Sequence, residues 1–344
     1  MRVLHVLASN KYSGAENVVC QIIDAFKNEV EMAYCSLNGE IRNTLTEKQV
    51  QFCPMSKFSL KELKRVVDEF TPDIIHAHDV KASIIASRLH KNYKIVSHIH
   101  GNDKRNMGKI TLKSLIYKMC LKNIDKVLLV SKSCLDEFYF KKSLENKCEI
   151  LYNVINVENL YKTIENEKVA YDYDICYLGR LAEVKNPLRT LKIMKSCVDF
   201  NRNIKCALIG DGELMDSCQQ YIVENKLEKN IELLGFQSCP HKFVKDAKVL
   251  LMSSINEGTP MCALEALALG VPLVSTKTDG MVDLIENDKN GYLYDEDDQA
   301  IKFITKLIDD KNMQQVIRKN CLEFSSNYND IEKYKDKLKK IYTE

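Results

Sequence analysis

The sequence predicts an α/β protein made of two doubly wound domains, each built on a parallel sheet. A chain of 344 residues is long for one compact core and favours two domains. Short runs rich in β-branched residues alternate with helical stretches along most of the chain, which is typical of βαβ units. A polar segment at about 156–171 interrupts this alternation, and we interpret it as the linker between the domains.

The strand-like runs follow in order on both sides of the linker. Before it come RVLHVLA, EMAYCSL, DIIHAH, KIVSHIH, KVLLV and CEILYN, and after it come DICYLG, KCALIG, IELLGF, KVLLMSS, PLVST and GYLY. We therefore expect an N-terminal domain at 1–158, a second domain at 170–325, and a C-terminal helix at 326–344 that packs back on the first domain. A cleft between two such domains is the default ligand site.

The composition excludes several classes of protein. A hydrophobic content of 45% beside 28% charged residues is that of a soluble globular protein, and a net charge of +2 gives no general reason to bind nucleic acid. The 13 cysteines are scattered through apolar segments without a C-x-x-C pair, as expected for reduced core residues. No apolar run reaches the length of a membrane span, and no cleavage site follows the first run, so we expect a cytoplasmic protein.

The stretch EGTPMCALE, at 257–265, predicts a helix that starts directly after a strand. Thr259 is a good N-cap, Pro260 suits the first helical position, and Gly270 suits the stop. Such a helix start presents unpaired backbone N–H groups that attract phosphate. Glu257 would then lie at the carboxyl end of a strand, where open α/β sheets bind ligands. The alternative is an ordinary crossover with solvated glutamates.

A second loop, GRLAEVKN, carries two cations after the strand-like run DICYL. Arg180 offers a planar fork of donors and Lys185 a compact charge, so together they could clamp a diphosphate without a metal ion. Alternatively, they are two surface cations in a loop. Because this loop and the EGTP loop both follow strands of the second domain, we expect them at the same edge of one sheet. Such an edge suits a nucleotide-diphosphate sugar, because its cations can bind the phosphates and its carboxylates can bind the sugar hydroxyls.

Two further glycine turns carry less information. IGDGE, at 209–213, lacks the third glycine of the dinucleotide fingerprint, and its Asp211 would repel a pyrophosphate. We interpret it as a tight structural turn, and a Rossmann oxidoreductase is poorly supported. In the first domain, Gly14 follows the opening strand and would allow the backbone to approach a phosphate closely.

Four histidines in the first domain stand in pairs two residues apart, His76 with His78 and His98 with His100. Each pair shares one face of a strand. His100, at a strand end next to a glycine, is the candidate for a substrate contact, whereas a lone histidine is more often structural. The spacing raises the question of zinc, but the sequence locates neither carboxylate partners nor the groups that would hydrogen-bond to the ligands, and we expect no metal ion.

Taken together, these motifs resemble the family 4 glycosyltransferases, retaining enzymes of the GT-B type, of the kind that builds bacterial surface polysaccharides. The resemblance covers nearly the whole chain. GRLAEVKN is similar to the family's Gly-Arg-Leu signature with its lysine, and EGTPMCALE to its motif of two glutamates separated by seven residues. SGAE, HIHG, GDGE, LLGF and NGYL match weaker features in the expected order. The resemblance implies two Rossmann-like domains, with the acceptor bound by the first and the donor by the second.

The resemblance also implies roles for residues of the donor site. Arg180 and Lys185 would hold the donor diphosphate and stabilise it as it leaves. Glu257 would accept hydrogen bonds from hydroxyls of the donor sugar, near the backbone N–H groups from Gly258 onward. The remaining implied contacts are His100 with the donor sugar, Glu265 with the ribose, Phe236 with the base, and Gly14 with the phosphates, and Gly258 and Thr259 are also expected to bind the substrate.

The implied reaction moves a hexose or N-acetylhexosamine from a nucleotide-diphosphate sugar, with a UDP-sugar as the expected donor. Preorganised cations supply most of the stabilisation of the leaving diphosphate, and we expect neither cofactor nor metal. No carboxylate is obviously placed as a nucleophile, so same-face attack is the working hypothesis. Ser13, Asn156 and Asp283 depart from residues common in the family, which bears on specificity rather than on activity.

The acceptor is indicated only by a helical stretch at 104–126, where lysines are mixed with apolar residues. The lysines are Lys104, Lys109, Lys113, Lys118 and Lys122. Such a stretch could rest on an anionic membrane at the inner face of the cell, where a lipid-linked glycan resides. A solvated amphipathic helix packed on its own domain is the alternative.

Two other classes of protein remain open. A sugar-nucleotide epimerase or a glycan phosphorylase can share the architecture, but the first needs an acid/base set facing the sugar and the second usually has a much longer chain. A non-catalytic nucleotide-sugar sensor is the third alternative. The presence of both cations and both glutamates argues against it, and binding without turnover would identify it.

Overall fold

The computed structural model describes residues 1–101, 104–165 and 169–344. They form two compact units, one of Met1–Asn153 together with Ile331–Glu344, and one of Val154–Asp330. Each unit contains one parallel sheet with helices on its faces, which confirms the fold class predicted from the alternation of strands and helices. No helix in the described ranges combines the length and the apolar character that crossing a bilayer requires.

The sheet of the first unit is built, in the described residues, from seven parallel strands. They are β1 (Arg2–Val6), β2 (Glu31–Leu37), β3 (Phe52–Met55), β4 (Ile74–His78), β5 (Lys94–Ile99), β6 (Lys126–Leu129) and β7 (Cys148–Ile150). Their order is β3-β2-β1-β4-β5-β6-β7. The direction of winding reverses between β1 and β4, so the loops after these two strands flank the usual ligand position of such a sheet.

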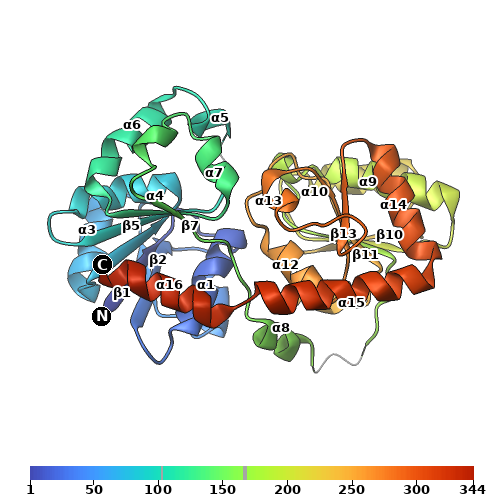
Figure 1. The fold of residues 1–344 in the computed structure, drawn as a ribbon, viewed down its shortest axis with the longest axis horizontal. Helices are drawn as coiled ribbons and strands as arrows, with labels where there is room; N and C mark the ends of the chain where they lie inside the picture. Colours follow the sequence, from blue (N-terminus) through green and yellow to red (C-terminus); the bar gives the residue numbers. More distant parts are fainter. Residues whose placement is uncertain (102–103, 166–168) are drawn as a thin grey trace. The chain divides into compact units, whose positions relative to one another are not determined.

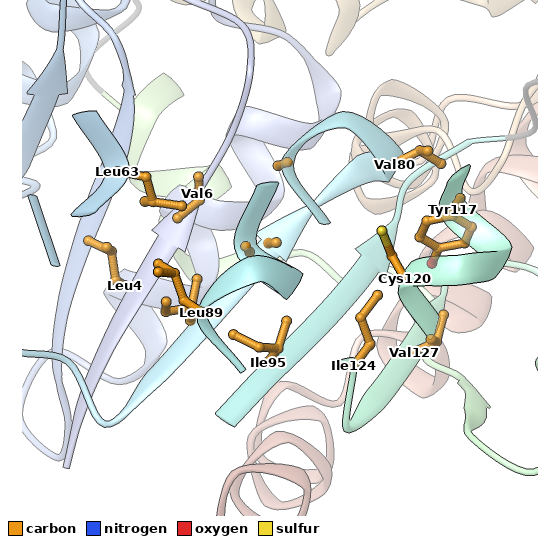
Figure 2. Close-up of a cluster of buried hydrophobic side chains, with 14 of the residues drawn as sticks. Leu4, Val6, Leu63, Val80, Leu89, Ile95, Tyr117, Cys120, Ile124 and Val127 are labelled. Atoms are coloured by element: carbon orange, nitrogen blue, oxygen red, sulfur yellow. The ribbon is translucent and has the colours of Figure 1, made fainter. Parts of the chain in front are cut away.

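Helices cover both faces of this sheet (Figure 1). They are α1 (Gly14–Ala25), α2 (Ile41–Glu47), α3 (Leu60–Phe70), α4 (Asp79–Ala86), α5 (Lys104–Met107), α6 (Leu112–Cys120), α7 (Lys132–Asp136) and α16 (Ile331–Thr343). On the face under α3, α4 and α6, alternate strand residues such as Leu4, Val6 and Ile95 join one apolar core (Figure 2). Because successive side chains of a strand point to opposite faces, the residues between them lie under α1 and α16.

The last helix belongs to the first unit. The Nζ atom of Lys335 lies 2.7 Å from a carboxylate oxygen of Glu29, and the Tyr342 hydroxyl lies 2.8 Å from Nδ1 of His76. The helices α1 and α16 contact each other, and Phe26, at the end of α1, packs against Tyr342 of α16. The apolar positions of α16 give it a buried face.

The sheet of the second unit has, among the described residues, six parallel strands. They are β8 (Ile175–Leu178), β9 (Cys206–Ile209), β10 (Ile231–Gly235), β11 (Val249–Met252), β12 (Leu273–Thr276) and β13 (Gly291–Tyr294), in the order β10-β9-β8-β11-β12-β13. The helices are α8 (Val157–Ile164), α9 (Pro187–Phe200), α10 (Met215–Glu224), α11 (His241–Val244), α12 (Met261–Ala268), α13 (Asp279–Val282), α14 (Asp297–Asp309) and α15 (Lys311–Tyr328). The winding reverses between β8 and β11.

Part of the predicted linker is a helix. The side chain of Asn156 caps α8 by accepting a hydrogen bond from the backbone N–H of Asn159 at 3.0 Å. Leu160 and Ile164 are buried, and the Tyr161 hydroxyl donates to the carbonyl of Ala268 at 2.9 Å. The interpretation of this segment as linker is therefore wrong for 157–164, and its residues 166–168 lie outside the described structure.

The helix predicted after Glu257 starts later than expected. Its N-cap is Pro260 rather than Thr259, and α12 begins at Met261. The reason is that Pro260 has an extended ψ of 129°, which keeps it outside the helix. The predicted stop is confirmed, because Gly270 follows the helix with a φ of +74° that favours glycine.

Candidate active site

The two predicted loops of the second unit lie side by side. β8 and β11 pair in parallel, so the loops that follow them leave the same edge of the sheet, at the point where the winding reverses. The backbone N–H of Ile255 donates to the carbonyl of Val184 at 2.8 Å, and the Ser253 hydroxyl donates to the carbonyl of Asn186 at 2.8 Å. These bonds tie the loop of Arg180 and Lys185 to the loop of Glu257, as the sequence predicts.

Lys185 and Glu257 form an ion pair at this edge. The Nζ atom lies 2.5 and 2.7 Å from the two carboxylate oxygens, and the Ser254 hydroxyl donates to one of them at 2.6 Å. Glu257 is only 7% exposed. Burial alone would lower the pKa of Lys185, but the Glu257 carboxylate raises it above its ordinary value, so the ammonium group stays charged.

Arg180 adds a second positive charge beside this pair. Its side chain is exposed, and among the described residues its guanidinium has no ion-pair partner. The loop backbone is fixed, because the Arg180 carbonyl accepts hydrogen bonds from the Tyr177 hydroxyl at 2.8 Å and from the N–H of Ala182 at 2.9 Å. The charge of Arg180 acts on Lys185, whose pKa it lowers slightly against the larger effect of Glu257.

The backbone of the GDGE turn packs directly against the backbone of the Arg180 loop. A Cβ atom on Gly210 would lie 2.0 Å from the carbonyl oxygen of Gly179, so only glycine lets the two backbones approach this closely. The N–H of Leu181 donates to the carbonyl of Asp211 at 2.9 Å. The interpretation of GDGE as a structural turn therefore agrees with the geometry, and the turn positions the loop that carries Arg180.

A similar close approach holds the Glu257 loop. Gly258 and Thr259 are buried, and a Cβ atom on Gly280, in α13, would lie 1.2 Å from the Gly258 carbonyl oxygen. The first turn of α12 follows directly after this loop. The backbone next to Glu257 is thus fixed by packing on both sides.

Glu265 lies in α12 and is paired with a histidine that the sequence analysis does not single out. The Nε2 atom of His241, in α11, lies 3.1 Å from a carboxylate oxygen of Glu265. Burial alone would lower the pKa of His241, but the neighbouring carboxylate raises it to about 9. The partners are on different helices, so no local pattern predicts the pair; only the rule that a buried carboxylate needs a partner points to it.

Phe236 follows β10 and is 62% exposed. In the strand order, β10 is separated from β8 by β9, so Phe236 stands at the same edge of the sheet but away from the ion pair of Lys185 and Glu257. The structure brings Arg180, Lys185 and Glu257 together and places Phe236 further along that edge. Its contact with a base stays a prediction.

Gly14 and His100 belong to the first unit. Gly14 is the first residue of α1, after β1. Apart from its chain neighbours and the nearby backbone of α1, no described atom lies within 4 Å of a Cβ built on it. His100 follows β5, and its backbone N–H donates to the Asp79 carboxylate at 3.0 Å. Burial lowers the pKa of His100, and Asp79 partly offsets this. The space beside Gly14 is thus open, whereas the ring of His100 is held inside its own unit.

A cavity of about 400 Å³ in the first unit includes His100 in its lining. Polar side chains of Asp79, Lys113 and Glu137 face it together with an apolar wall. The apolar wall is formed by Val80, Ile99, Met107, Leu129, Phe138 and Leu144. A pocket of this size with few polar groups suits part of a small molecule.

Two units with parallel sheets and a cationic, carboxylate-bearing strand edge are the architecture of GT-B glycosyltransferases. The family described as Glycosyltransferase Family 4 matches residues 12–159, and the one described as Glycosyl transferases group 1 matches residues 162–323. An uncharacterised glycosyltransferase of Methanocaldococcus jannaschii is 30% identical over 74% of this chain and 71% of its own. The chain therefore belongs to the family 4 glycosyltransferases and is an enzyme of that kind.

Other relatives extend over the whole chain. The Escherichia coli enzyme named UDP-Gal:alpha-D-GlcNAc-diphosphoundecaprenol alpha-1,3-galactosyltransferase is 26% identical over 99% of this chain and 96% of its own. Among solved structures, the Anabaena protein HepE in complex with UDP matches with a TM-score of 0.81 and 17% identity, over 100% of both chains. At this identity the likeness concerns the fold, and it confirms the predicted GT-B architecture.

Proposed function

We propose that the protein is a retaining glycosyltransferase that transfers a hexose or N-acetylhexosamine from a UDP-sugar to a growing, lipid-linked surface glycan. The main support for the proposed nucleotide-sugar donor is the grouping of Arg180, Lys185 and Glu257 at one edge of the sheet in the second unit. The names of the relatives support the rest, since the Escherichia coli enzyme uses a UDP-sugar and a diphosphoundecaprenol-linked acceptor.

Charge explains why this edge suits a nucleotide-diphosphate sugar. As the bond between the anomeric carbon and the phosphate oxygen breaks, negative charge grows on the diphosphate, and fixed cations stabilise that charge without a metal ion. Arg180 is the exposed cation that a diphosphate meets first, and Lys185 is already held in place by Glu257. The carboxylate of Glu257 keeps acceptor capacity for sugar hydroxyls beyond its bonds to Lys185 and Ser254.

The proposed stereochemistry is retention by same-face attack. The acceptor oxygen bonds to the anomeric carbon on the face that the diphosphate leaves, and the acceptor proton passes to the leaving phosphate oxygen. Glu257 is the buried carboxylate of this edge, but its ion pair with Lys185 suits it to hold hydroxyls rather than to attack carbon. His100 is proposed to contact the donor sugar, Glu265 the ribose, and Gly14 the phosphates.

The experiment is a turnover assay. Purified protein is incubated in chelator with UDP-glucose, UDP-galactose and their N-acetylated counterparts, with and without a diphosphoundecaprenol-linked sugar. We expect UDP release that depends on the acceptor and a product whose anomeric configuration, read by NMR, equals that of the donor. Release only with added divalent metal, an inverted product, or tight binding of every UDP-sugar without turnover would each overturn the proposal.

The membrane contact is a separate part of the proposal. In α6 and just before it, apolar side chains are exposed to an unusual degree, with Leu112 at 75% and Met119 at 71%. Lys118 and Lys122 accompany them, as expected of a helix that lies in an anionic membrane interface. Of the other lysines named from the sequence, Lys109 and Lys113 are described, whereas the side chain of Lys104 lies outside the described structure.

Vesicle flotation tests this contact. We expect the protein to bind vesicles containing phosphatidylglycerol and to lose about tenfold in affinity when Leu112 and Met119 are both changed to Ser. Phe200→Ser is the matched control, because Phe200 is 74% exposed in α9 of the second unit. Equal binding by the double variant, or equal loss in the control, would contradict a membrane role for α6.

A further inference from the structure

Histidines occupy one face of the central strands of the first unit. His5 is paired in register with His76, and His78 with His98, on the neighbouring strands β1, β4 and β5. Because side chains alternate along a strand, all four lie on the same face of the sheet, and each is at most 1% exposed. Strands of a buried parallel sheet are normally continuous apolar runs. Imidazole rings in such a place require partners for their nitrogens.

Hydrogen bonds account for only some of these nitrogens. Nδ1 of His5 lies 3.0 Å from Nε2 of His78, whose Nδ1 lies 2.7 Å from Nε2 of His100. Among the described residues, neither ring nitrogen of His98 has a hydrogen-bond partner, and the same holds for Nδ1 of His100. Buried polar atoms left without partners are costly, and an ion or water that the protein binds is the usual explanation.

We propose that His78, His98 and His100 form a binding site for a divalent first-row transition-metal ion, with Zn²⁺ as the reference ion. One ring nitrogen from each of the three lies within 4.8 Å of the others. Imidazole nitrogens bound tetrahedrally at about 2.1 Å from zinc stand about 3.4 Å apart, so small ring movements close the site. An all-imidazole ligand set favours zinc, copper or nickel over magnesium or calcium.

The hydrogen-bond pattern leaves lone pairs where the ion needs them. If Nε2–H of His78 donates to Nδ1 of His5, Nδ1 of His78 carries a lone pair directed toward Nε2 of His100. His100 then binds the ion as the tautomer that carries its proton on Nδ1, so that Nε2 offers a lone pair to the ion instead of a proton to His78. His5 then acts as a positioning residue, as carboxylates and carbonyls do behind metal-bound histidines.

A second group, His5 with His76 and His78, also has nitrogens within 4.8 Å. Two observations favour the first group. His100 and Asp79 line the cavity of about 400 Å³, which supplies an entry path and room for water as a fourth ligand. The Asp79 carboxylate, held by the backbone N–H of His100, places a negative charge next to the ion. His5 and His76 do not line this cavity in the described structure.

The proposed ion is separate from the cations that hold the diphosphate, and it meets the proposed donor site only through His100. The diphosphate-binding cations are in the second unit, and the donor proposal requires no metal there. The ion instead joins β4 to the end of β5 and fixes the ring of His100 through Nε2. Nδ1 is then the other polar atom of the His100 side chain. The expectation from the sequence, that the histidine pairs bind no metal, changes because the fold brings the pairs together.

The test measures zinc on the full chain. Protein stripped with chelator is given a slight excess of ZnCl₂, desalted and assayed for zinc and protein, and the zinc edge is examined by X-ray absorption. We expect about one zinc per chain, bound by nitrogen at about 2.0–2.1 Å. His98→Leu should fold, because His98 loses no hydrogen bond, and should retain at least tenfold less zinc. His90→Gln, outside the cluster, should retain as much as the wild type.

Three results would overturn the proposal. The wild type retains no more zinc than His98→Leu, or the absorption spectrum shows sulfur ligands from the cysteines, or His90→Gln loses the ion as well. The spectrum of the wild type decides the matter even if His98→Leu fails to fold. UDP binding in chelator is measured in parallel, and it should be unaffected, so failure of the metal site and failure of the proposed function are distinguishable.

Discussion

The two units differ in how their buried polar side chains are paired. In the second unit, buried carboxylates are matched with cations, Glu257 with Lys185 and Glu265 with His241. In the first unit, the buried groups around His98 are neutral, and several of their nitrogens lack partners among the described residues. The difference teaches that charge pairing stabilises the buried groups of the second unit, for which we propose an anionic ligand, whereas the neutral rings of the first unit keep unpaired nitrogens, for which we propose a metal ion.

The largest effect should come from breaking the charge pairing in the second unit. Lys185→Met leaves Glu257 buried without its cation, which typically costs about 3–5 kcal/mol of unfolding free energy, and it removes a cation from the leaving diphosphate. We expect kcat/KM to fall at least a hundredfold. Chemical denaturation and initial-rate kinetics measure the two losses.

A double variant separates stability from catalysis. Lys185→Met combined with Glu257→Gln should recover most of the stability, because no buried charge is left unpaired, but none of the activity. Lys195→Met is the matched control, since Lys195 pairs with Asp199 on an exposed helix face. Recovery of activity in the double variant would show that the pair is structural only.

One glycine from each unit extends the comparison. Gly210 supports the Arg180 loop of the second unit, and Gly14 lies in the proposed phosphate loop of the first. Gly210→Ala places a Cβ atom 2.0 Å from a backbone oxygen at a φ of +140°, so we expect a loss of about 2 kcal/mol or more in unfolding free energy. Gly14→Ala has open space and should change stability by less than about 0.5 kcal/mol.

The Gly14 variant should nevertheless weaken UDP binding if this residue approaches phosphate. Denaturation of both variants in parallel, followed by UDP titration of Gly14→Ala, provides the readout. A large destabilisation at Gly14 would contradict the open space beside it, and unchanged UDP affinity would remove Gly14 from the donor site.

The charge pair of His241 and Glu265 should also make the stability of the second unit depend on pH. The pKa of His241 is raised from 6.5 to about 9 in the folded protein, so its pair with Glu265 contributes stability that is fully present below pH 6.5 and lost as the pH rises through about 9. The rise corresponds to about 3 kcal/mol. Denaturation across this range should show the loss in the wild type and not in His241→Gln. A flat wild-type profile would mean that the pair is uncharged.

Much of the fold follows from local patterns, and its exceptions have physical reasons. The alternation of strands and helices predicts both sheets, and Gly270 predicts the end of α12. The helix α8 is missed because its buried apolar residues are few, and its stability depends on contacts such as that of Tyr161 with Ala268. Tertiary packing of this kind leaves little trace in a short sequence window.

Some residues of the candidate sites could be predicted from the sequence, and others could not. Arg180, Lys185 and Glu257 could be grouped from the sequence because each follows a strand of one parallel sheet. His241 and His5 could not, because their partners lie in other elements and no local spacing connects them. Sequence patterns predict which residues lie at one edge of a sheet, whereas pairs between residues of different helices or strands depend on the packed structure.

The central claim is that the second unit binds a nucleotide diphosphate through its own cations. Calorimetric titration of UDP in chelator, on the wild type, on Arg180→Ala and on Arg202→Ala as the exposed-arginine control, tests it most directly. We predict binding to the wild type and the control, and affinity about 10–100-fold weaker for Arg180→Ala. Equal affinity in all three proteins, or binding only after a divalent metal ion is added, would contradict the claim.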